Sequence, residues 1–300
     1  MNNFLRFTLI FWVLALCIFS TVPLLALANG DLVNRLNETL NQSSIKQKEL
    51  SILVTLHAEG KATEVFNLNT KEKFIPASLT KILTAGMSLE KYPVGFRFVT
   101  ELLATGPVEG GQLKGDLFLK GGGDPSFVSE SMWVLVNDFV RSGIKSVEGD
   151  LVVDDSRFDS ERFDQGRDPQ RVDRAYDAPV GAMSFNWNTV NIFVRPGKKK
   201  GDKAQVFIDP ENSYIQLINK AVTGSSQSKR NLQASRKPNG KSTDMIVISG
   251  SIPQGGDEFV IYKGVSHPDL WSAHNLRSFL LKRDISIKGS IRSGRVPLEA

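Results

Sequence analysis

Ser78 and Lys81 are the two residues whose types and spacing could perform chemistry. On a helix, positions three apart share one face, so the hydroxyl and the amine would lie within hydrogen-bonding reach. A serine hydroxyl becomes a good nucleophile when a base takes its proton, and a lysine amine buried in an apolar setting can serve as that base. The pair therefore indicates a serine acyltransferase, against the alternative of a chance Ser-x-x-Lys on a surface helix.

The segment that must position this pair, residues 74–93, is apolar nearly all round. Pro76 stands near its first turn and a second proline ends it, so the pattern predicts a buried helix. An unpaired lysine would be costly on such a helix, which favours the catalytic interpretation of the pair. Two runs with strand character, 51–57 and 62–68, predict a β-hairpin upstream, and residues 31–50 predict a polar amphipathic helix.

Downstream of this helix the sequence predicts a mixture of helices and strands. Residues 129–141 have helical periodicity and end at Gly143. A weak internal repeat places one helix before the letters SGIKSVEGDLVV and a second helix, 270–283, before RDISIKGSIRSG. A helix that leads into a strand is typical of α/β or α+β subdomains. A β-rich block is interrupted at 224–242 by a basic low-complexity stretch, for which we expect a mobile loop.

The first 28 residues predict a secretory signal peptide. A short polar start with one cation is followed by a long apolar run that closes on Ala26-Leu27-Ala28, a small-x-small cleavage site. The alternative is a retained membrane anchor, because the run approaches the roughly 20 residues of a bilayer span. Cleavage would remove Cys17, the only cysteine, so we expect an exported protein with neither disulfides nor a thiol nucleophile.

Other ligand classes are disfavoured by the pattern of charges and histidines. The formal charge of +5 could suit nucleic acid, with Lys198-Lys199-Lys200 as contacts, but export favours solvated loops and no nucleic-acid partner. The 3 histidines form no zinc motif, and residues 121–125, Gly-Gly-Gly-Asp-Pro, fit a tight turn better than a phosphate loop. An acidic group that lacks the spacing of a calcium loop comprises Asp150, Asp154, Asp155 and Asp159.

Several segments agree in order and spacing with one known family. Residues 76–92 resemble the nucleophile helix of penicillin-binding proteins and serine β-lactamases. Residues 113–127, 143–159 and 176–197 extend the resemblance. Together they resemble the class C low-molecular-mass penicillin-binding proteins, the D-Ala-D-Ala carboxypeptidases and endopeptidases of serine peptidase family 13, from about Leu50 to the end of the chain.

This resemblance implies an α+β fold with a partial transpeptidase/β-lactamase-like domain over 29–95, made of the hairpin and the nucleophile helix. Inserted α/β and β-rich subdomains are expected over 96–300. Ser78 would be the acylated nucleophile and Lys81 its base, acting on peptidoglycan stem peptides, and β-lactams would acylate the same serine. No metal or organic cofactor is implied, and membrane contact would be limited to the signal peptide or a peripheral surface.

The resemblance also points to residues that would bind substrate and to motifs that do not occur. Family members carry an aspartate that binds the amino group of the stem peptide, and Asp154 or Asp155 matches it by position, with a solvated turn as the equal alternative. The family also needs a Ser-x-Asn motif and a Lys-Thr-Gly strand, and no Lys-Thr-Gly occurs in this sequence. Ser184-Phe185-Asn186 has the right letters but lies in a segment that resembles an insertion, so we interpret it as structural.

Two functions therefore stay open at this point. The first is a serine-type D-Ala-D-Ala carboxypeptidase, or endopeptidase, present here as an incomplete and inactive form. The second is a non-catalytic protein of the cell envelope that binds wall peptide or a partner.

Overall fold

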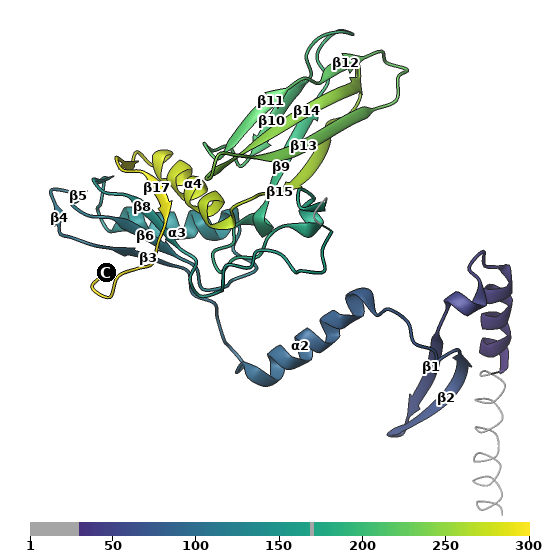
Figure 1. Ribbon diagram of the computed structural model, residues 1–300. Helices are drawn as coiled ribbons and strands as arrows, with labels where there is room; N and C mark the ends of the chain where they lie inside the picture. Colours follow the sequence, from purple (N-terminus) through teal and green to yellow (C-terminus); the bar gives the residue numbers. More distant parts are fainter. Residues whose placement is uncertain (1–29, 169–170) are drawn as a thin grey trace, which may run out of the picture. The chain divides into compact units, whose positions relative to one another are not determined.

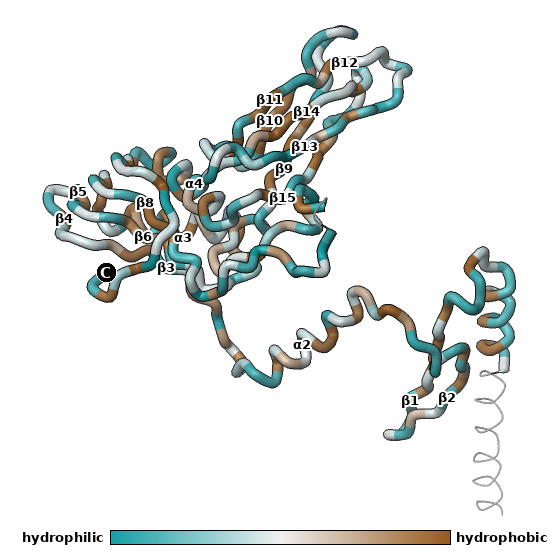
Figure 2. The backbone as a smooth tube through the Cα atoms, in the orientation of Figure 1, coloured by the Kyte–Doolittle hydropathy of each residue, from teal (hydrophilic) through white to brown (hydrophobic). Residues whose placement is uncertain are grey.

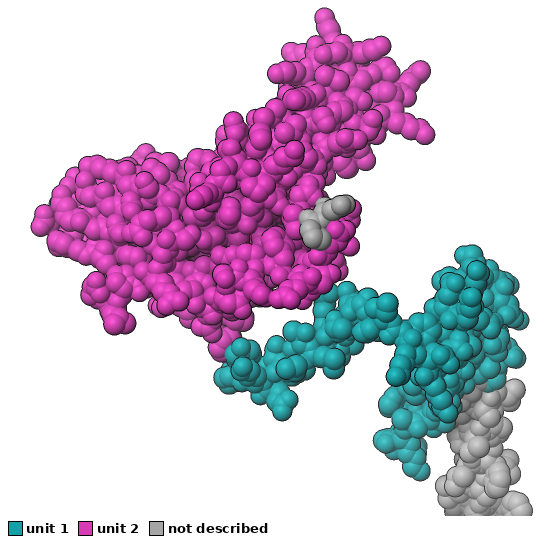
Figure 3. Space-filling view, viewed as in Figure 1, with its two compact units in different colours: residues 1–94 teal, residues 95–300 magenta. Residues whose placement is uncertain are grey.

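The computed structural model describes residues 30–168 and 171–300, and the predicted signal peptide lies outside them. The chain divides into two compact units, Met1–Val94 and Gly95–Ala300 (Figure 3). Among the helices of the described ranges, none combines the length and the hydropathy that a bilayer crossing requires. The border at Gly95 does not by itself define a transpeptidase-like domain, so that boundary stays a prediction.

The first unit contains the predicted hairpin. Strands β1 (Ile52–Ala58) and β2 (Lys61–Leu68) pair antiparallel, and Ala58 lies opposite Lys61. The two turn residues have left-handed backbones, with φ of 49° at Glu59 and 74° at Gly60, as tight two-residue hairpin turns require. The hairpin is therefore confirmed. The polar helix ends earlier than predicted: within the described residues it runs from 30 to 42, and a 3-10 turn, η1 (Gln47–Glu49), follows.

The predicted apolar helix also forms, as the 3-10 turn η2 (Ala77–Leu79) followed by α2 (Thr80–Lys91). The prediction that this helix is buried is wrong for the described chain, because every residue from Thr80 to Lys91 is exposed. Residues of apolar type nonetheless recur along α2 (Figure 2). An apolar pattern indicates only that a helix has a surface suited to packing. Burial of that surface also requires a second surface that contacts it.

The second unit begins with an α/β subdomain whose two sheets repeat one motif. Helix α3 (Ser129–Arg141) leads into β7 (Ser146–Val147) and β8 (Leu151–Asp154), and α4 (Pro268–Leu281) leads into β16 (Ser286–Ile287) and β17 (Ile291–Ser293). The sheet orders are β16-β7-β5-β4 and β17-β8-β6-β3. The remaining strands are β3 (Glu101–Ala104), β4 (Val108–Glu109), β5 (Gln112–Leu113) and β6 (Leu117–Lys120).

The weak sequence repeat corresponds to a structural repeat, and its two copies lie side by side. Strand β16 pairs parallel with β7, and β17 pairs parallel with β8. The equivalent glycines Gly149 and Gly289 each lie against another backbone segment. A Cβ on Gly289 would come within 2.3 Å of the Gly149 carbonyl oxygen, and a Cβ on Gly149 would lie 2.6 Å from the Gly115 carbonyl oxygen. No side chain fits at either position, which explains the glycine in each copy.

A β-rich subdomain lies between the two copies of the repeat in sequence and extends away from α4 (Figure 1). One sheet has the order β10-β9-β15, and the other has β11-β14-β12 with β13 also paired to β14. Their bounds are β9 (Thr189–Arg195), β10 (Gln205–Asp209), β11 (Ile215–Asn219), β12 (Val222–Gly224), β13 (Asn231–Asn239), β14 (Thr243–Pro253) and β15 (Phe259–Gly264).

The prediction of a mobile loop at 224–242 is wrong for residues 231–239. Residues Asn231–Asn239 form β13, which pairs antiparallel with β14 along its whole length. The strand was not recognised because one of its inward positions is Arg236, which is buried against Asp244, so a strand-like alternation of apolar residues is missing.

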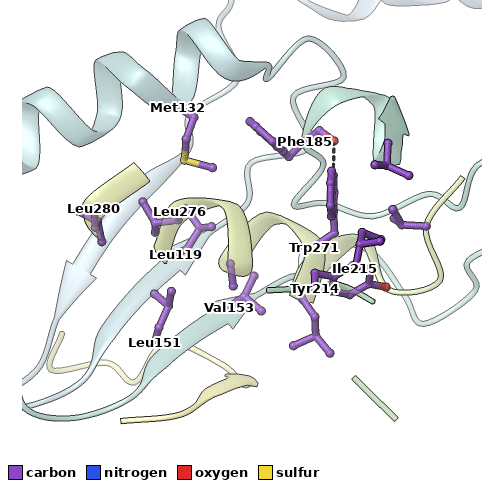
Figure 4. Packing of buried hydrophobic residues seen from close by; sticks show 14 of the residues in the cluster. Leu119, Met132, Leu151, Val153, Phe185, Tyr214, Ile215, Trp271, Leu276 and Leu280 are labelled. Carbon is purple, nitrogen blue, oxygen red and sulfur yellow. Dashed lines mark hydrogen bonds between the residues drawn. The ribbon is translucent and has the colours of Figure 1, made fainter. Parts of the chain in front are cut away.

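The core of the second unit joins its subdomains through α4. Trp271 on α4 is fully buried and donates its indole N–H to the carbonyl oxygen of Phe185, at 3.1 Å (Figure 4). Tyr214 packs edge-on against the same indole, with ring centroids 5.6 Å apart. Because these aromatic groups come from distant parts of the chain, the α/β and β-rich subdomains share one core. The result is the expected α+β fold.

Candidate active site

The candidate nucleophile and base lie together at the start of α2. Lys81 donates from Nζ to Oγ of Ser78 at a distance of 2.9 Å. Ser78 belongs to the 3-10 turn η2, and Lys81 lies in the first turn of the following helix. The Thr80 hydroxyl donates to the Ala77 carbonyl oxygen at 2.9 Å and ties the turn to the helix. The spacing therefore produces the contact that a lysine base needs to accept a serine proton.

The residue before the serine has an unusual backbone. Ala77 has φ of 44°, in the left-handed region that alanine rarely adopts. A left-handed residue costs roughly 1–2 kcal/mol, so it persists only where neighbouring contacts hold it. Such outliers cluster at functional sites, which is consistent with a turn shaped to present Ser78.

Both members of the pair are exposed to solvent in the described chain. On the helix that carries them, four apolar side chains keep most of their surface in water: Leu79 at 65%, Ile82 at 68%, Leu83 at 69% and Met87 at 70%. Within the first unit, the pair therefore lacks the water-excluded setting that strengthens electrostatic catalysis.

The Ser-Phe-Asn letters have the structural role predicted for them. The Asn186 side chain accepts a hydrogen bond from the backbone N–H of Ser129 and donates one to its hydroxyl, both at 3.0 Å. Ser129 is the first residue of α3, so Asn186 caps this helix from 57 residues away. The Ser184 hydroxyl donates to the Gly181 carbonyl oxygen at 2.9 Å. These side chains hold a turn and a helix end.

The glycine-rich residues 121–125, for which a tight turn was predicted, form a close junction with two other segments. A Cβ on Gly121 would lie 2.4 Å from the Met183 nitrogen, and a Cβ on Gly122 would lie 2.0 Å from the Val99 carbonyl oxygen. The Gly123 N–H donates to the Ala182 carbonyl oxygen at 2.8 Å. The glycines are needed because two other segments pass against the loop.

Asp154 is buried at the end of β8 and accepts hydrogen bonds from within the chain. Its carboxylate receives the backbone N–H groups of Ser156 at 2.9 Å and Val296 at 2.8 Å. Burial pushes the pKa of Asp154 upward, but these donors outweigh burial and hold the pKa below its usual value. The Asp154 carboxylate thus holds the segment that follows β17 through the hydrogen bond from Val296.

Asp155 is half-buried, with 8% of its side chain exposed, and its carboxylate contacts Arg162 and the backbone N–H of Met183. Arg162 reaches Asp269 on α4 as well, at 3.6 Å. Burial raises the pKa of Asp155 despite these donors. Sequence reasoning missed Arg162 and Asp269, because an arginine in an irregular loop carries no periodic signal. A role of Asp154 or Asp155 toward substrate stays a prediction.

The other acidic residues of the group lie apart from a metal-binding geometry. Asp150 accepts from Arg292 at 2.7 Å, and Asp159 accepts from the Glu161 N–H at 3.0 Å. Within residues 30–168 and 171–300, no group of three or more His, Cys, Asp or Glu side chains is placed to hold a metal ion.

Comparison with known proteins places this arrangement in context. The chain is 29% identical over 297 residues to a D-alanyl-D-alanine carboxypeptidase of Actinomadura sp. (strain R39), covering 95% of this chain and 54% of the relative. It is 22% identical over 234 residues to the D-alanyl-D-alanine carboxypeptidase DacB of Haemophilus influenzae, covering 76% of this chain and 47% of that protein. The chain thus spans about half the length of these curated relatives.

The fold resembles that of a solved structure from the same group. The crystal structure of penicillin-binding protein 4 (dacB) from Haemophilus influenzae matches with a TM-score of 0.64 at 22% identity, covering 78% of this chain and 51% of that chain. A structure of that protein complexed with a novel β-lactam matches with a TM-score of 0.54, covering 74% of this chain and 46% of that one. A profile of the D-Ala-D-Ala carboxypeptidase 3 (S13) family matches residues 32–300, and the chain therefore belongs to this family.

Proposed function

We propose that this chain supplies the nucleophile, Ser78, and the base, Lys81, of a serine-type D-Ala-D-Ala carboxypeptidase that acts on peptidoglycan stem peptides. The observation that carries the proposal is the 2.9 Å contact from Lys81 Nζ to Ser78 Oγ in a chain of this family. The same chemistry would extend to endopeptidase cleavage where the leaving amine belongs to a cross-link.

The reaction follows from the two groups. The neutral Lys81 amine takes the Ser78 hydroxyl proton while Oγ attacks the carbonyl carbon of the penultimate D-Ala. The bond from that carbon to nitrogen then breaks, and the terminal D-Ala leaves as its amine after receiving a proton. Water attacks the resulting ester, restoring the hydroxyl and releasing the shortened peptide. A β-lactam would acylate Ser78 by the same attack on its strained amide.

We further propose that the 300 residues alone are not a competent carboxypeptidase. They contain no Lys-Thr-Gly, and the Ser-x-Asn letters that they do contain cap α3. The loss of a single oxyanion donor costs on the order of 100- to 1000-fold in rate, so nucleophile and base alone are insufficient. A non-catalytic envelope protein that binds wall peptide or a partner is the second candidate, favoured by the exposure of Ser78 and Lys81.

A labelling experiment distinguishes these possibilities. The protein as its own cells make it is treated with a fluorescent penicillin, and the same is done with the purified 300-residue chain. We expect an adduct on the peptide that contains Ser78 in the first sample and none at a comparable rate in the second. Ser78→Ala should abolish the adduct, whereas Ser88→Ala, which alters an exposed serine on the same helix, should not.

The outcomes separate the two claims. An adduct on a residue other than Ser78 in the cellular protein would remove Ser78 as nucleophile. Rapid stoichiometric labelling of Ser78 in the purified chain would show that the chain is complete for acylation. Absence of any adduct in both samples would favour the non-catalytic candidate.

Export through residues 1–28 is part of the proposal, because the substrate lies outside the cytoplasm. We expect the mature protein to begin at Asn29, since Ala26 and Ala28 fit the small-residue cleavage rule. Mass spectrometry of the protein from the cell envelope measures this directly, and an intact Met1 end would contradict it.

A further inference from the structure

Positive charge is concentrated in the β-rich subdomain. Residues 189–264 contain 12 Lys or Arg and 6 Asp or Glu, a formal charge of +6. The rest of the second unit, residues 95–188 and 265–300, contains 16 basic and 19 acidic residues, a formal charge of −3. Because the two subdomains share one core but differ in sign, the charge is a property of one surface region and not of the chain as a whole.

Most of these cations lie at one end of the subdomain, which we call the distal tip. It consists of the loops 196–203, 225–230 and 254–258, at the end of the strands away from α4 (Figure 1). With the adjoining end of β9, it exposes seven cations and three acids. The cations are Arg195, Lys198, Lys199, Lys200, Lys203, Lys229 and Arg230. Figure 2 shows hydrophilic loops next to β12 at this end.

Loop 196–203 is fixed by hydrogen bonds to Thr223 on β12 and to Gln254. The Thr223 carbonyl oxygen accepts the Gly201 N–H at 2.9 Å, and its hydroxyl accepts the Gly197 N–H at 2.8 Å. The Gln254 side chain donates to the Lys198 carbonyl oxygen at 2.9 Å. The turn that contains Lys198, Lys199 and Lys200 is therefore fixed to the ends of β12 and β14, so an ordered backbone carries these charges.

The two arginines of the tip are also positioned by their neighbours. The Arg230 guanidinium lies 3.5 Å from the centroid of the Phe259 ring, within the range of a cation–π contact. Arg195 pairs with Glu258 and lies 5.5 Å from the Phe207 ring. The lysines that form ion pairs within residues 30–168 and 171–300 lie outside the tip, so the ammonium groups of the tip are available to an external anion.

The composition of the tip selects among anionic ligands. Loops 196–203, 225–230 and 254–258 contain Pro, Gly, Ser, Gln and charged residues, without a single Leu, Ile, Met, Phe or Trp. Interfacial membrane binders insert such apolar residues among their cations, so the tip does not fit a bilayer. Single-stranded nucleic acid is held by stacking on aromatic rings, which these loops also lack. Lysine ammonium groups and serine hydroxyls suit phosphate oxygens along a flexible chain.

We propose that the distal tip binds a phosphodiester-linked anionic polymer with a polyol backbone, of the kind found outside the cytoplasmic membrane. The contacts are charge-based and independent of sequence, with Lys198, Lys199 and Lys200 as the central group. This inference concerns a surface distant in sequence from Ser78 and does not depend on the acyl-transfer proposal.

The test measures binding of the full chain to poly(glycerol phosphate), by fluorescence anisotropy of the labelled polymer at several salt concentrations. With about four phosphate contacts, affinity should fall roughly 50-fold between 50 and 200 mM salt. The tip variant carries Lys198→Ser, Lys199→Ser and Lys200→Ser, which leaves the turn glycines in place. Its affinity should be at least tenfold lower than that of the unaltered chain at about 100 mM salt.

A matched variant controls for overall charge. Lys145→Ser, Lys237→Ser and Lys241→Ser remove the same charge from exposed positions outside the tip, and this variant should bind within about twofold of the unaltered chain. Equal losses in both variants, or no binding by the unaltered chain at low salt, would overturn the proposal. Vesicles of phosphatidylglycerol provide a second arm: if the tip variant weakens vesicle binding more than polymer binding, the ligand is a bilayer and the proposal fails.

Discussion

Substitution of Asn186 tests directly whether the Ser-Phe-Asn letters are structural or catalytic. Asn186 accepts the first N–H of α3 and has φ of 47°, in the left-handed region that asparagine tolerates better than alanine. Asn186→Ala removes the cap and places an alanine in that backbone. Asn186→Gly removes the cap but accepts the backbone, and Asn186→Asp keeps the acceptor beside a helix N-terminus, where a negative charge is favourable.

The expected magnitudes follow from these two contributions. Loss of a capping side chain costs about 1 kcal/mol, and the left-handed alanine costs about 1 kcal/mol more. For a unit of this size, each 1 kcal/mol corresponds to roughly 2–4 °C in melting temperature. We therefore expect a decrease of roughly 4–8 °C for Asn186→Ala, roughly 2–4 °C for Asn186→Gly, and a change within about 2 °C for Asn186→Asp.

Thermal unfolding followed by circular dichroism measures these shifts, and amide hydrogen exchange of Ser129 and its neighbours reports the cap itself. Asn231→Ala, at an exposed asparagine of β13, should change little and serves as the control. A glycine variant less stable than the alanine variant would refute the argument from the backbone. Unchanged stability in all three variants, together with lost acylation in the cellular protein, would identify Asn186 as catalytic.

Three further predictions concern the base, a histidine and a buried ion pair. Lys81→Arg should abolish penicillin labelling of Ser78 in the cellular protein, because a guanidinium does not release its proton; a fully labelled variant would remove lysine from the base role. Burial lowers the pKa of His274 to about 4, so the unfolded chain, which titrates near 6.5, binds the proton first. The free energy of unfolding should therefore fall as pH drops from about 6.5 toward 4, and His274→Gln should flatten that portion of urea-unfolding profiles. Asp244→Ala should lower the free energy of unfolding by about 3–5 kcal/mol, because it leaves Arg236 buried without its carboxylate; addition of Arg236→Leu should recover part of the loss in urea titrations.

Local chemistry explains which elements could be predicted from the sequence. The hairpin follows from two alternating runs around Glu59-Gly60, and α3 was predicted with its observed bounds, because both are encoded by short-range patterns. The repeat predicted a helix that leads into a strand in each copy, and the order α3 to β7 and α4 to β16 confirms it, whereas the pairing of β7 with β16 was not predicted. In each case the residues whose pattern predicts the element are the residues that form it.

Long-range polar contacts account for what could not be predicted. Strand β13 hides a buried Arg236 that is acceptable only because Asp244 and Ser266, from other segments, surround it. The same holds for Asp155, whose partner Arg162 comes from a loop and also pairs with Asp269 on α4. Whether a polar residue can occupy an inward position depends on a hydrogen-bonding or charged partner from another segment. Because local periodicity does not reveal that partner, it assigns such a residue to a loop.

The candidate site combines both situations in one helix. The contact between Lys81 and Ser78 depends on positions three apart, so it forms wherever the helix forms. The exposed side chains of Leu79, Ile82, Leu83 and Met87 would each gain about 1.5–3 kcal/mol on complete burial, which is large against a net domain stability of about 5–15 kcal/mol. A helix with so much exposed apolar surface is suited to packing against a second surface. The surface that buries these side chains would also exclude water from Ser78, so packing and catalytic competence should be gained together.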